Sequence, residues 1–406
     1  MQINPADNVF ILISTAFVLL MSMPALAIFY GGLTKVKSIL NTIMMVGVAF
    51  SVVSFIWLAY GYSLSFSGDG AFIGNLKYLF LSGINPSDPA PAAENLYHYL
   101  FIFFQMTFAA ITVALMAGAF VERMKFGAWL IVTVLWATFV YFPVAHWIWG
   151  GGWLANLGTL DFAGGLVVHE TSGLGALVGA IMLGRRKEAL MLPSSLPLVA
   201  IGTGLLWFGW FGFNGGSALG MGAQAVSAAF VTSIAAFIGG FVWMMLEWIK
   251  FKKPTSLGFF TGIIAGLATI TPASGFVDVG AGMVIGFLGA VVCFWAVVYV
   301  KNRFKYDDSL DVFGVHGVGG MAGALLLALL AKPEVAEVKG LFFGGGLSGL
   351  WHQIVGILAV GVYTVVVSFI IFKIADKLVG LRVDKDTESE GLDEAVHGEK
   401  AYQKEI

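Results

Sequence analysis

Two stretches of sequence decide the fold: DFAGGLVVHETSG at residues 161–173 and DVFGVHGVGG at residues 311–320. Each has an aspartate, then a phenylalanine, a Val-His pair, and a glycine four residues after the histidine. Each lies in a long apolar run, where ionisable side chains are costly and usually face an interior path. The pattern predicts two corresponding membrane helices that bring His169 and His316 together.

The composition indicates an integral membrane protein. Of the 406 residues, 58% are hydrophobic and 11% are charged, whereas a soluble domain carries about 25% charged residues. The composition therefore argues against a water-soluble enzyme, and the net charge of -2 argues against a nucleic-acid partner. The single cysteine, Cys293, allows no intramolecular disulfide and no CxxC metal or redox motif.

Apolar stretches of about 20 residues mark helices that cross a bilayer. We predict an all-α membrane protein with eleven such spans in membrane lipid. The last span, at about 1.5 Å per residue, is longer than the hydrocarbon core of about 30 Å, so it should tilt, bend or protrude. The predicted spans are residues 9–30, 41–66, 97–121, 127–147, 165–184, 196–214, 225–249, 257–274, 279–300, 312–331 and 348–376.

Basic residues cluster in alternate loops of this pattern. By the positive-inside rule these loops are cytoplasmic. The amino terminus is then outside, and the tail from about Lys377 is inside, in a multi-pass protein of the inner (cytoplasmic) membrane. The first residues carry no charged n-region or small-residue cleavage site, so we expect no signal peptide. The basic loops hold Lys35, Lys37, Arg123, Lys125, Arg185, Arg186, Lys187, Lys250, Lys252, Lys253, Lys301, Arg303 and Lys305; the opposite loops hold Lys77, Lys332 and Lys339.

An odd number of spans puts the two chain ends on opposite sides of the membrane, and two halves of five spans each have opposite topology. Spans one to five (residues 9–184) and six to ten (residues 196–331) then form inverted repeats, a known transporter architecture. The repeated motif around His169 and His316 lies in the fifth span of each half. We expect a transmembrane domain over residues 1–376, ending in the eleventh helix, and a cytoplasmic tail over residues 377–406.

The two histidines are the leading candidates for chemistry. A neutral imidazole offers one hydrogen-bond donor and one acceptor, so two in contact can share a proton and leave outward-facing nitrogens for a small polar guest. The alternative is two unrelated core histidines, each bonded to a neighbouring helix.

Metal or haem ligation is a competing interpretation. Zinc needs three or four ligands, and the other candidates (His146, His352 and Cys293) lie near span ends or on other helices. A bis-His haem is disfavoured because each helix has one central histidine. We predict no metal or cofactor, and no enzyme active site, because no nucleophile–base motif lies at depth.

Aromatic residues near the span ends form a second candidate site. Phe104 and Phe108 lie four residues apart on one helical face. Most such aromatics belong to interfacial belts or face lipid, but a few facing inward could recruit a cation, for about 0.5–2 kcal/mol. The candidates in two other segments are Trp147, Trp149, Trp153, Trp207, Trp210, Phe213, Asn214 and Ser217.

Acidic residues flank the histidine motifs. Asp161 and Asp311 begin their spans, where an aspartate caps the helix and interacts with its dipole. We favour this structural role over direct substrate binding. Glu170 follows His169 at about 100° around the helix. We expect it to meet a polar partner on another helix or at a subunit interface.

Between residue 8 and Tyr402 the sequence resembles the Amt ammonium transporter family in its bacterial form. The segments that carry the resemblance are ALAIFYGGL, FQMTFAAITVALMAGAFVERMKF, HWIWGGGWLANLGTLDFAGGLVVH, GWFGFNGGSA, TPASGFVDVGAG, DVFGVHGVGG, GLRV and EGLDEAVHGEKAY.

The resemblance implies a homotrimer in which each subunit has eleven spans and its own pore. It also implies that a PII-type signalling protein docks on the cytoplasmic face and tail. Trp149, Ser217 and Phe108 match the residues that recruit the substrate, and we add Phe104 to this recruitment site. Phe108 and Phe213 match a stacked gate. His169, His316 and Trp210 match the pore, and Asp161 matches an essential acidic residue near the entrance.

This reading predicts transport of ammonium or ammonia. Ammonium would bind at the outer aromatic site, lose a proton, and cross as ammonia past the two histidines. The proton either returns outside or follows, and the sequence does not decide between them. The alternative function is an ammonium sensor that signals through a PII-type partner.

Overall fold

The computed structural model describes residues 3–188 and 192–402. Within them, ten helical segments are long and apolar enough to cross a membrane, and each overlaps one predicted span. The predicted span 257–274 corresponds to a shorter apolar helix, Ser256–Ile270. Its 15 residues extend about 22 Å, less than the hydrocarbon core. The ten long segments are Pro5–Leu33, Val36–Phe66, His98–Ala119, Phe126–Leu157, Gly165–Leu183, Leu196–Gly215, Ala223–Phe251, Val279–Phe304, Phe313–Leu330 and Gly346–Val379.

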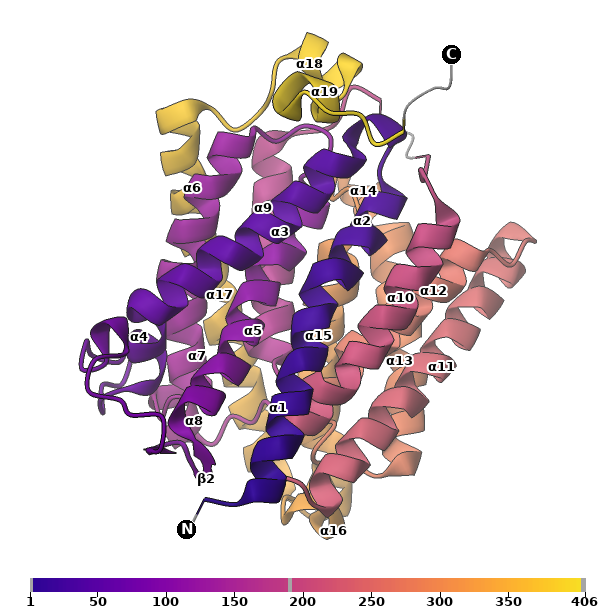
Figure 1. Ribbon diagram of the computed structural model, residues 1–406. Coiled ribbons are helices and arrows are strands. Elements are labelled where there is room, and N and C mark those ends of the chain that lie inside the picture. Colours follow the sequence, from indigo (N-terminus) through magenta and orange to yellow (C-terminus); the bar gives the residue numbers. More distant parts are fainter. Residues whose placement is uncertain (1–2, 189–191, 403–406) are drawn as a thin grey trace.

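Among the described residues, the regular secondary structure is almost entirely helical (Figure 1). A short antiparallel pair, β1 (Pro89–Ala90) and β2 (Ala93–Tyr97), is the exception. The α-helices are α1 (Pro5–Leu20), α2 (Ala27–Leu33), α3 (Ile39–Ile56), α4 (Tyr62–Phe66), α5 (His98–Met116), α6 (Phe126–Trp136), α7 (Phe142–Ile148), α8 (Trp153–Leu157), α9 (Thr171–Leu183), α10 (Leu196–Trp210), α11 (Ala223–Phe251), α12 (Ser256–Ile270), α13 (Val279–Trp295), α14 (Lys301–Phe304), α15 (Val318–Leu330), α16 (Pro333–Ala336), α17 (Gly346–Val379), α18 (Lys385–Glu390) and α19 (Leu392–His397).

Several long segments are interrupted by π-helical turns. Such turns often occur at functional sites, because the wider turn re-aims its side chains. The short 3₁₀ turns are η2 (Val36–Ser38), η4 (Leu79–Leu81), η5 (Ala117–Ala119) and η11 (Leu341–Phe343). The π turns are η1 (Met21–Leu26), η3 (Trp57–Gly61), η6 (Ala137–Tyr141), η7 (Gly165–Glu170), η8 (Phe211–Gly215), η9 (Ala296–Val300) and η10 (Phe313–Gly317).

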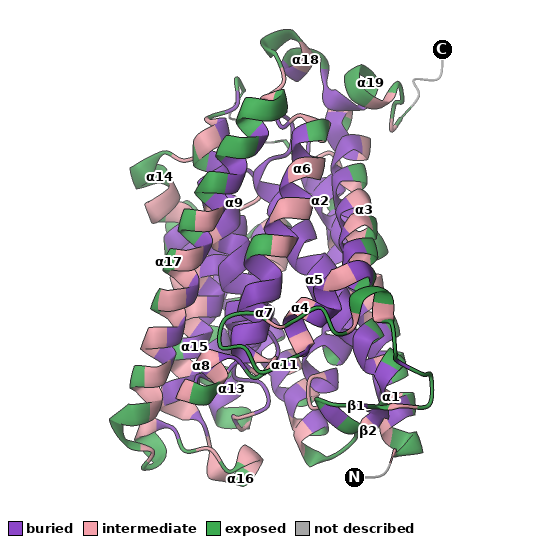
Figure 2. Cartoon of the chain, turned by 90° about the vertical axis from the view of Figure 1, so that its left-hand side faces the viewer, coloured by how far each residue is buried: buried purple, intermediate pink, exposed green. Residues whose placement is uncertain are grey.

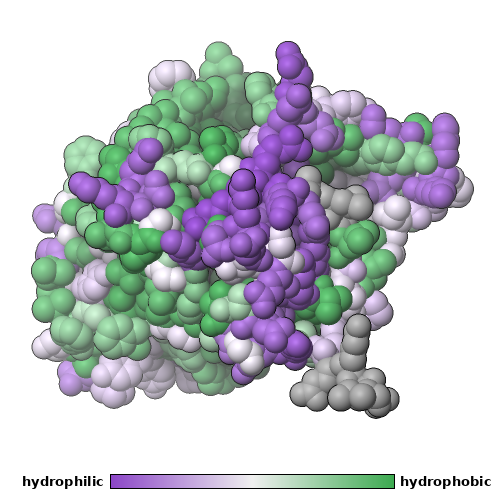
Figure 3. Space-filling model, turned by 90° about the horizontal axis from the view of Figure 1, so that it is seen from above, coloured by the Kyte–Doolittle hydropathy of each residue, from purple (hydrophilic) through white to green (hydrophobic). Residues whose placement is uncertain are grey.

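The described ends of the chain lie at opposite ends of the helix bundle (Figure 1). The tail helices α18 and α19 cover one end, and α1 begins at the other. Seen from the tail end, hydrophilic residues gather around the tail and hydrophobic residues surround them (Figure 3). We call this the tail end and the other the N-terminal end.

Burial follows the position of each helix in the bundle (Figure 2). In the most apolar window of α5, 89% of the residues are buried, whereas the corresponding value for α17 is 28%. α17 has 34 residues and is therefore about 50 Å long, so it extends beyond a bilayer core as expected. The central position of α5 makes it one wall of the site described next.

The two histidine-bearing segments cross in close contact. A Cβ at Gly173 would lie 2.3 Å from the backbone of Gly317, and a Cβ at Gly320 would lie 2.3 Å from the Gly165 carbonyl oxygen. Small residues allow membrane helices to approach this closely. Gly173 and Gly320 are the glycines that follow each histidine by four residues, so the repeated sequence pattern marks the crossing point.

Candidate functional site

His169 and His316 meet at this crossing. His169 lies in η7 and His316 in η10, and the two Nδ1 atoms are 3.1 Å apart. Their rings are nearly parallel, at 21°, with centroids 5.1 Å apart. Both side chains are at most 5% exposed. The two histidines therefore lie together as one buried pair.

The contact fixes how protons are arranged on the pair. One Nδ1 must donate and the other must accept, since an N–H on both would prevent the contact. The donor ring, when neutral, then has a bare Nε2, and the acceptor ring has an Nε2–H. No described residue bonds the Nε2 of His169, which is buried. The pair can thus offer both a donor and an acceptor to a small guest.

A column of aromatic rings leads from the pair toward the N-terminal end. Phe213 in η8 lies 6.0 Å from the His169 ring and stacks on Phe108 of α5, with centroids 4.3 Å apart. Phe108 in turn contacts Phe104 at 5.0 Å and Trp149 at 6.0 Å, both edge-on. Phe104, Phe108 and Phe213 are each 1% exposed, so the stacked pair closes the column.

The polar groups of this column are oriented by backbone contacts. Ser217 donates its hydroxyl proton to the Phe213 carbonyl at 2.7 Å, which leaves the hydroxyl oxygen able to accept. The Trp149 indole N–H donates to the Asp161 carbonyl at 2.8 Å. Both residues are only partly buried. A cation would meet a hydroxyl acceptor and aromatic rings here.

Trp210 lies beside the histidines rather than in the outer group. Its ring is 5.7 Å from the His169 ring, and its indole N–H donates to the Thr271 hydroxyl at 3.0 Å. Because its polar atom is satisfied, Trp210 presents an apolar face to the histidines. This agrees with its predicted place in a pore wall.

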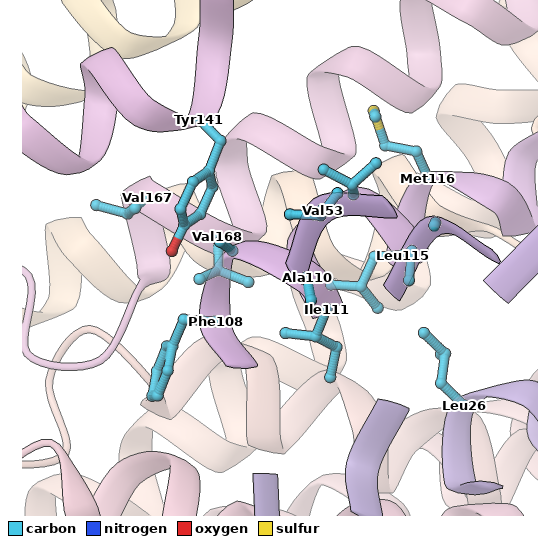
Figure 4. Close-up of a cluster of buried hydrophobic side chains, with 14 of the residues drawn as sticks. Leu26, Val53, Phe108, Ala110, Ile111, Leu115, Met116, Tyr141, Val167 and Val168 are labelled. Atoms are coloured by element: carbon cyan, nitrogen blue, oxygen red, sulfur yellow. The ribbon is translucent and has the colours of Figure 1, made fainter. Parts of the chain in front are cut away.

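The space around the histidines is narrow and mostly apolar. A cavity of about 10 Å³, enough for about one water molecule, is lined by both histidines and by apolar side chains that include Val168, Ile111 and Leu115. Figure 4 shows this apolar packing, with Phe108, Tyr141, Val167 and Val168 grouped at one side. A larger cavity of about 370 Å³ lies beyond, toward the tail end, and shares His316, Phe29, Tyr30 and Ile264 with it.

Asp161 organises the start of the His169 segment. One carboxylate oxygen accepts the backbone N–H groups of Gly164 and Gly165, at 2.8 and 2.6 Å. The other accepts those of Leu166 and Val167, at 2.8 and 3.0 Å. Four donors that a helix terminus leaves free are satisfied by one side chain. Asp161 therefore caps the start of the His169 segment in this structure.

The equivalent residue in the second motif is Asp308, not Asp311. Asp308 precedes His316 by eight residues, as Asp161 precedes His169, and its carboxylate accepts the Phe313 N–H at 2.7 Å. Asp311 instead pairs with Lys301 at 2.7 Å. The prediction for Asp311 was wrong because it used the nearest aspartate before the phenylalanine rather than the spacing from the aspartate to the histidine. That eight-residue spacing is visible in the sequence.

Of the two expectations for Glu170, a polar partner on another helix or at a subunit interface, the first is not met within the described part of the chain. It is fully buried, and neither carboxylate oxygen has a hydrogen-bond partner among the described residues. Oε1 lies against α17, 2.9 Å from where a Cβ at Gly361 would be. As expected from the 100° turn, Glu170 faces away from the side on which His169 meets His316.

The other candidate residues lie elsewhere. His146 contacts the carbonyls of Ser65 and Gly70, and Cys293 contacts the Val315 carbonyl. Trp147 donates to the Phe72 carbonyl, and Trp207 lies near Ser233. Within the described residues, no three His, Cys, Asp or Glu side chains are grouped as metal ligands would be.

The tail is bound to the loops at its end of the bundle. Glu388 accepts from the Arg382 guanidinium at 2.7 Å and from the Lys187 N–H at 2.6 Å. Asp393 accepts the Asn41 N–H at 2.8 Å. Residues 384–397 thus form a docked structure and not a solvated extension.

Comparison with known proteins identifies the family of the chain. Residues 9–402 match the sequence profile described as the Ammonium Transporter Family. The chain belongs to this family. This transporter is 48% identical to an ammonium transporter of Bacillus subtilis over 98% of either chain. It is 47% identical to one of Aquifex aeolicus over 99% of its own length and 94% of that protein.

Solved structures of related proteins have the same fold. The transporter matches Mep2 of Saccharomyces cerevisiae with a TM-score of 0.88 and 35% identity, over 95% of its chain and 89% of that one. It also matches a structure titled "Sensor Amt Protein" with a TM-score of 0.89 and 27% identity, over 97% and 98% of the two chains. The resemblance to the Amt family is therefore confirmed.

Proposed function

We propose that this ammonium transporter recruits ammonium at Trp149, Ser217, Phe104 and Phe108, removes a proton, and conducts ammonia past the Phe108–Phe213 gate and the His169–His316 pair. The observation that carries the proposal is the order in space of the stacked gate, the histidine pair and the larger cavity. The stacked gate lies on one side of the histidines and the 370 Å³ cavity on the other. An uncharged guest fits a narrow apolar passage of this kind.

Deprotonation explains how ammonium is distinguished from potassium. Moving an intact cation into so apolar a passage would remove its hydration at a large cost, tens of kcal/mol if nothing replaced the water. Ammonium can lose a proton and potassium cannot. A passage that admits only the neutral form therefore selects ammonium by its chemistry and not by its size.

The released proton has two possible fates, which an electrical measurement separates. It returns to the outer solution in electroneutral transport, or it crosses through the histidine pair in electrogenic transport. Current recordings on purified protein in liposomes decide between them. Uptake of ammonium without an ammonium-dependent current would rule out the electrogenic version.

The same proposal includes eleven spans, with α12 as the eighth, and inverted repeats over residues 9–184 and 196–331. The opposite positions of the two chain ends and the crossing of Gly173 with Gly317 support it. The basic loops support an orientation with the tail end in the cytoplasm and the amino terminus outside the inner (cytoplasmic) membrane. Labelling single cysteines introduced at Asp69 and Lys253, in the Cys293→Ala background, tests the orientation: only the first should react from outside.

The proposed assembly is a homotrimer. A groove of about 640 Å³ lies between α1, α10 and α11, and its lining includes Phe17, Phe208 and Phe230. Phe208 and Phe230 are 47% and 58% exposed. Apolar aromatic grooves of this size suit helix packing between subunits. The mass of the detergent-solubilised particle, corrected for bound detergent, tests this assignment.

Sensing through a PII-type protein at the tail is the second candidate function. The docked tail and the similarity to a sensor Amt structure favour it. Recovery of a PII-type protein by the full chain, but not by a chain ending at Arg382, would support docking. Equal recovery by both chains would count against it.

A further inference from the structure

The cavity of about 370 Å³ beyond His316 has charged side chains at its rim. Four are basic and two are acidic, so the lining is net positive: Arg185, Arg186, Lys301, Lys305, Asp307 and Asp311. In the proposed function, ammonia leaves the pore through this cavity. The two carboxylates are therefore the groups at which a small cation could be retained.

The first carboxylate is fully engaged by an arginine. Arg186 donates to Asp307 from its backbone N–H at 2.8 Å and from two guanidinium nitrogens at 2.9 and 2.8 Å. Burial alone would raise the pKa of Asp307, but Arg186 outweighs it and holds this pKa at about 2. Asp307 is thus a permanent half of a buried ion pair and offers no cation site.

The second carboxylate is held by one lysine. Lys301 Nζ lies 2.7 Å from Asp311 Oδ1, and both side chains are about a quarter exposed, at 23% and 27%. The backbone of Asp311 is fixed at φ 60°, in the turn that leads into η10 and His316. Asp311 is therefore a stationary anion that faces the path beyond the pore.

We propose that Lys301 is a specificity-determining residue, a tethered cation that occupies Asp311 and so prevents ammonium or potassium from being held in this cavity. The inference rests on the proposed direction of transport. A lysine ends in a compact ammonium group with three donors, so it resembles the transported cation chemically. Being tethered, it competes at an effective concentration of the order of millimolar or above.

The consequence is that neutral ammonia passes the cavity while cations are not retained. Without Lys301, the Asp311 carboxylate would be free beside the pore mouth. Ammonium formed there, or potassium from the adjoining solution, would then bind and obstruct the exit. Lys305 lines the same cavity and carries the same charge, but no contact joins it to Asp311. It supplies the matched control.

The test compares the full chain with Lys301→Gln, Lys305→Gln and the double variant Lys301→Gln/Asp311→Asn in liposomes. Ammonium uptake is measured with N-methylglucamine on both sides, then with potassium replacing it at about 0.15 M. Each rate is divided by that of the same variant without potassium. Potassium should lower the rate of ammonium uptake by Lys301→Gln about threefold or more. It should leave the uptake rates of the wild type, Lys305→Gln and the double variant unchanged.

Equal behaviour of Lys301→Gln and the wild type would overturn the proposal. So would potassium inhibition of the double variant, or equal inhibition of Lys305→Gln. Lys301→Met replaces Lys301→Gln if the latter elutes as aggregate. Thermal unfolding gives a second readout that needs no transport. Potassium should raise the unfolding temperature of Lys301→Gln and of no other variant in the set. That readout separates failure of this inference from failure of the proposed function.

Discussion

The Nδ1 atoms of His169 and His316 lie 3.1 Å apart although 147 positions separate them in sequence. One proton lies between these atoms, whichever ring carries it. An additional proton on the pair must therefore sit at an outward Nε2. The pair can accept a proton from a guest on one face and return one from the other, but it cannot hold two protons at the contact itself.

The histidine pair gives the first prediction. His169→Ala or His316→Ala removes the shared proton and widens the passage. Ammonium uptake should fall about a hundredfold, which is the lower end of the rate loss when a proton-transfer group is removed. Alternatively, the wider passage should let potassium through. Uptake and potassium flux in liposomes measure both effects. His352→Gln, outside the passage, is the control. Wild-type uptake with potassium still excluded in both alanine variants would show that the pore assignment is wrong.

The second prediction concerns the stacked gate. Phe213→Ala removes a ring whose centroid is 4.3 Å from that of Phe108, and the space gained is large enough for water. Stopped-flow light scattering should then detect water permeability that wild-type liposomes lack. Phe208→Ala removes a ring that packs against Phe17 in a tilted arrangement, with centroids 4.6 Å apart, away from the histidines. A leak of the same size in both variants would argue against a gate at Phe213.

Hydropathy predicted most of the fold because a bilayer imposes span length directly on sequence. The repeated motif predicted that His169 and His316 meet, and the glycine four residues after each histidine permits the crossing, since only small residues allow so close an approach. The π turns around His169 and His316 left no periodic signal, and the short helix α12 has the composition of a span without its length. Glu170 could not be placed because its surroundings come from α17, a helix far away in sequence.

The third prediction separates the structural and electrostatic roles of Asp161. Asp161→Ala leaves four buried N–H groups without an acceptor, which should cost about 3 kcal/mol or more of folding free energy. Asp161→Asn keeps one acceptor oxygen and should lose less. Thermal unfolding and uptake per folded molecule measure the two effects. An Asn variant with a normal unfolding midpoint and no uptake would show that the charge itself is required.

Asp308 gives a prediction about pH. Burial, reinforced by Asp311 and opposed by Lys301, raises the pKa of Asp308 to about 6, from an ordinary 3.8. A folded-state pKa above the unfolded value means that the ionised group destabilises the fold, here by about 3 kcal/mol at pH 8. The penalty should shrink as the pH falls from 6 toward 4.

Asp308→Asn removes this pH-dependent penalty. Its unfolding midpoint, relative to that of the wild type, should be higher at pH 8 than at pH 5. Asp69→Asn, in an exposed loop, is the control, and its difference from the wild type should not change with pH. A constant difference for Asp308→Asn across this range would contradict the assignment.

The tail gives the last prediction. Glu388 is 6% exposed at its side chain and joins Arg382 to the loop at Lys187, so Glu388→Ala removes the carboxylate that accepts from the partly exposed Arg382 guanidinium and from the Lys187 N–H. Loss of about 1.4 kcal/mol or more should release residues 384–397 and speed their cleavage by a protease about tenfold. Glu394→Ala breaks the pair with Lys400, which is more than half exposed on both sides and should matter little. If both variants are cleaved at the wild-type rate, Glu388 does not hold the tail in place.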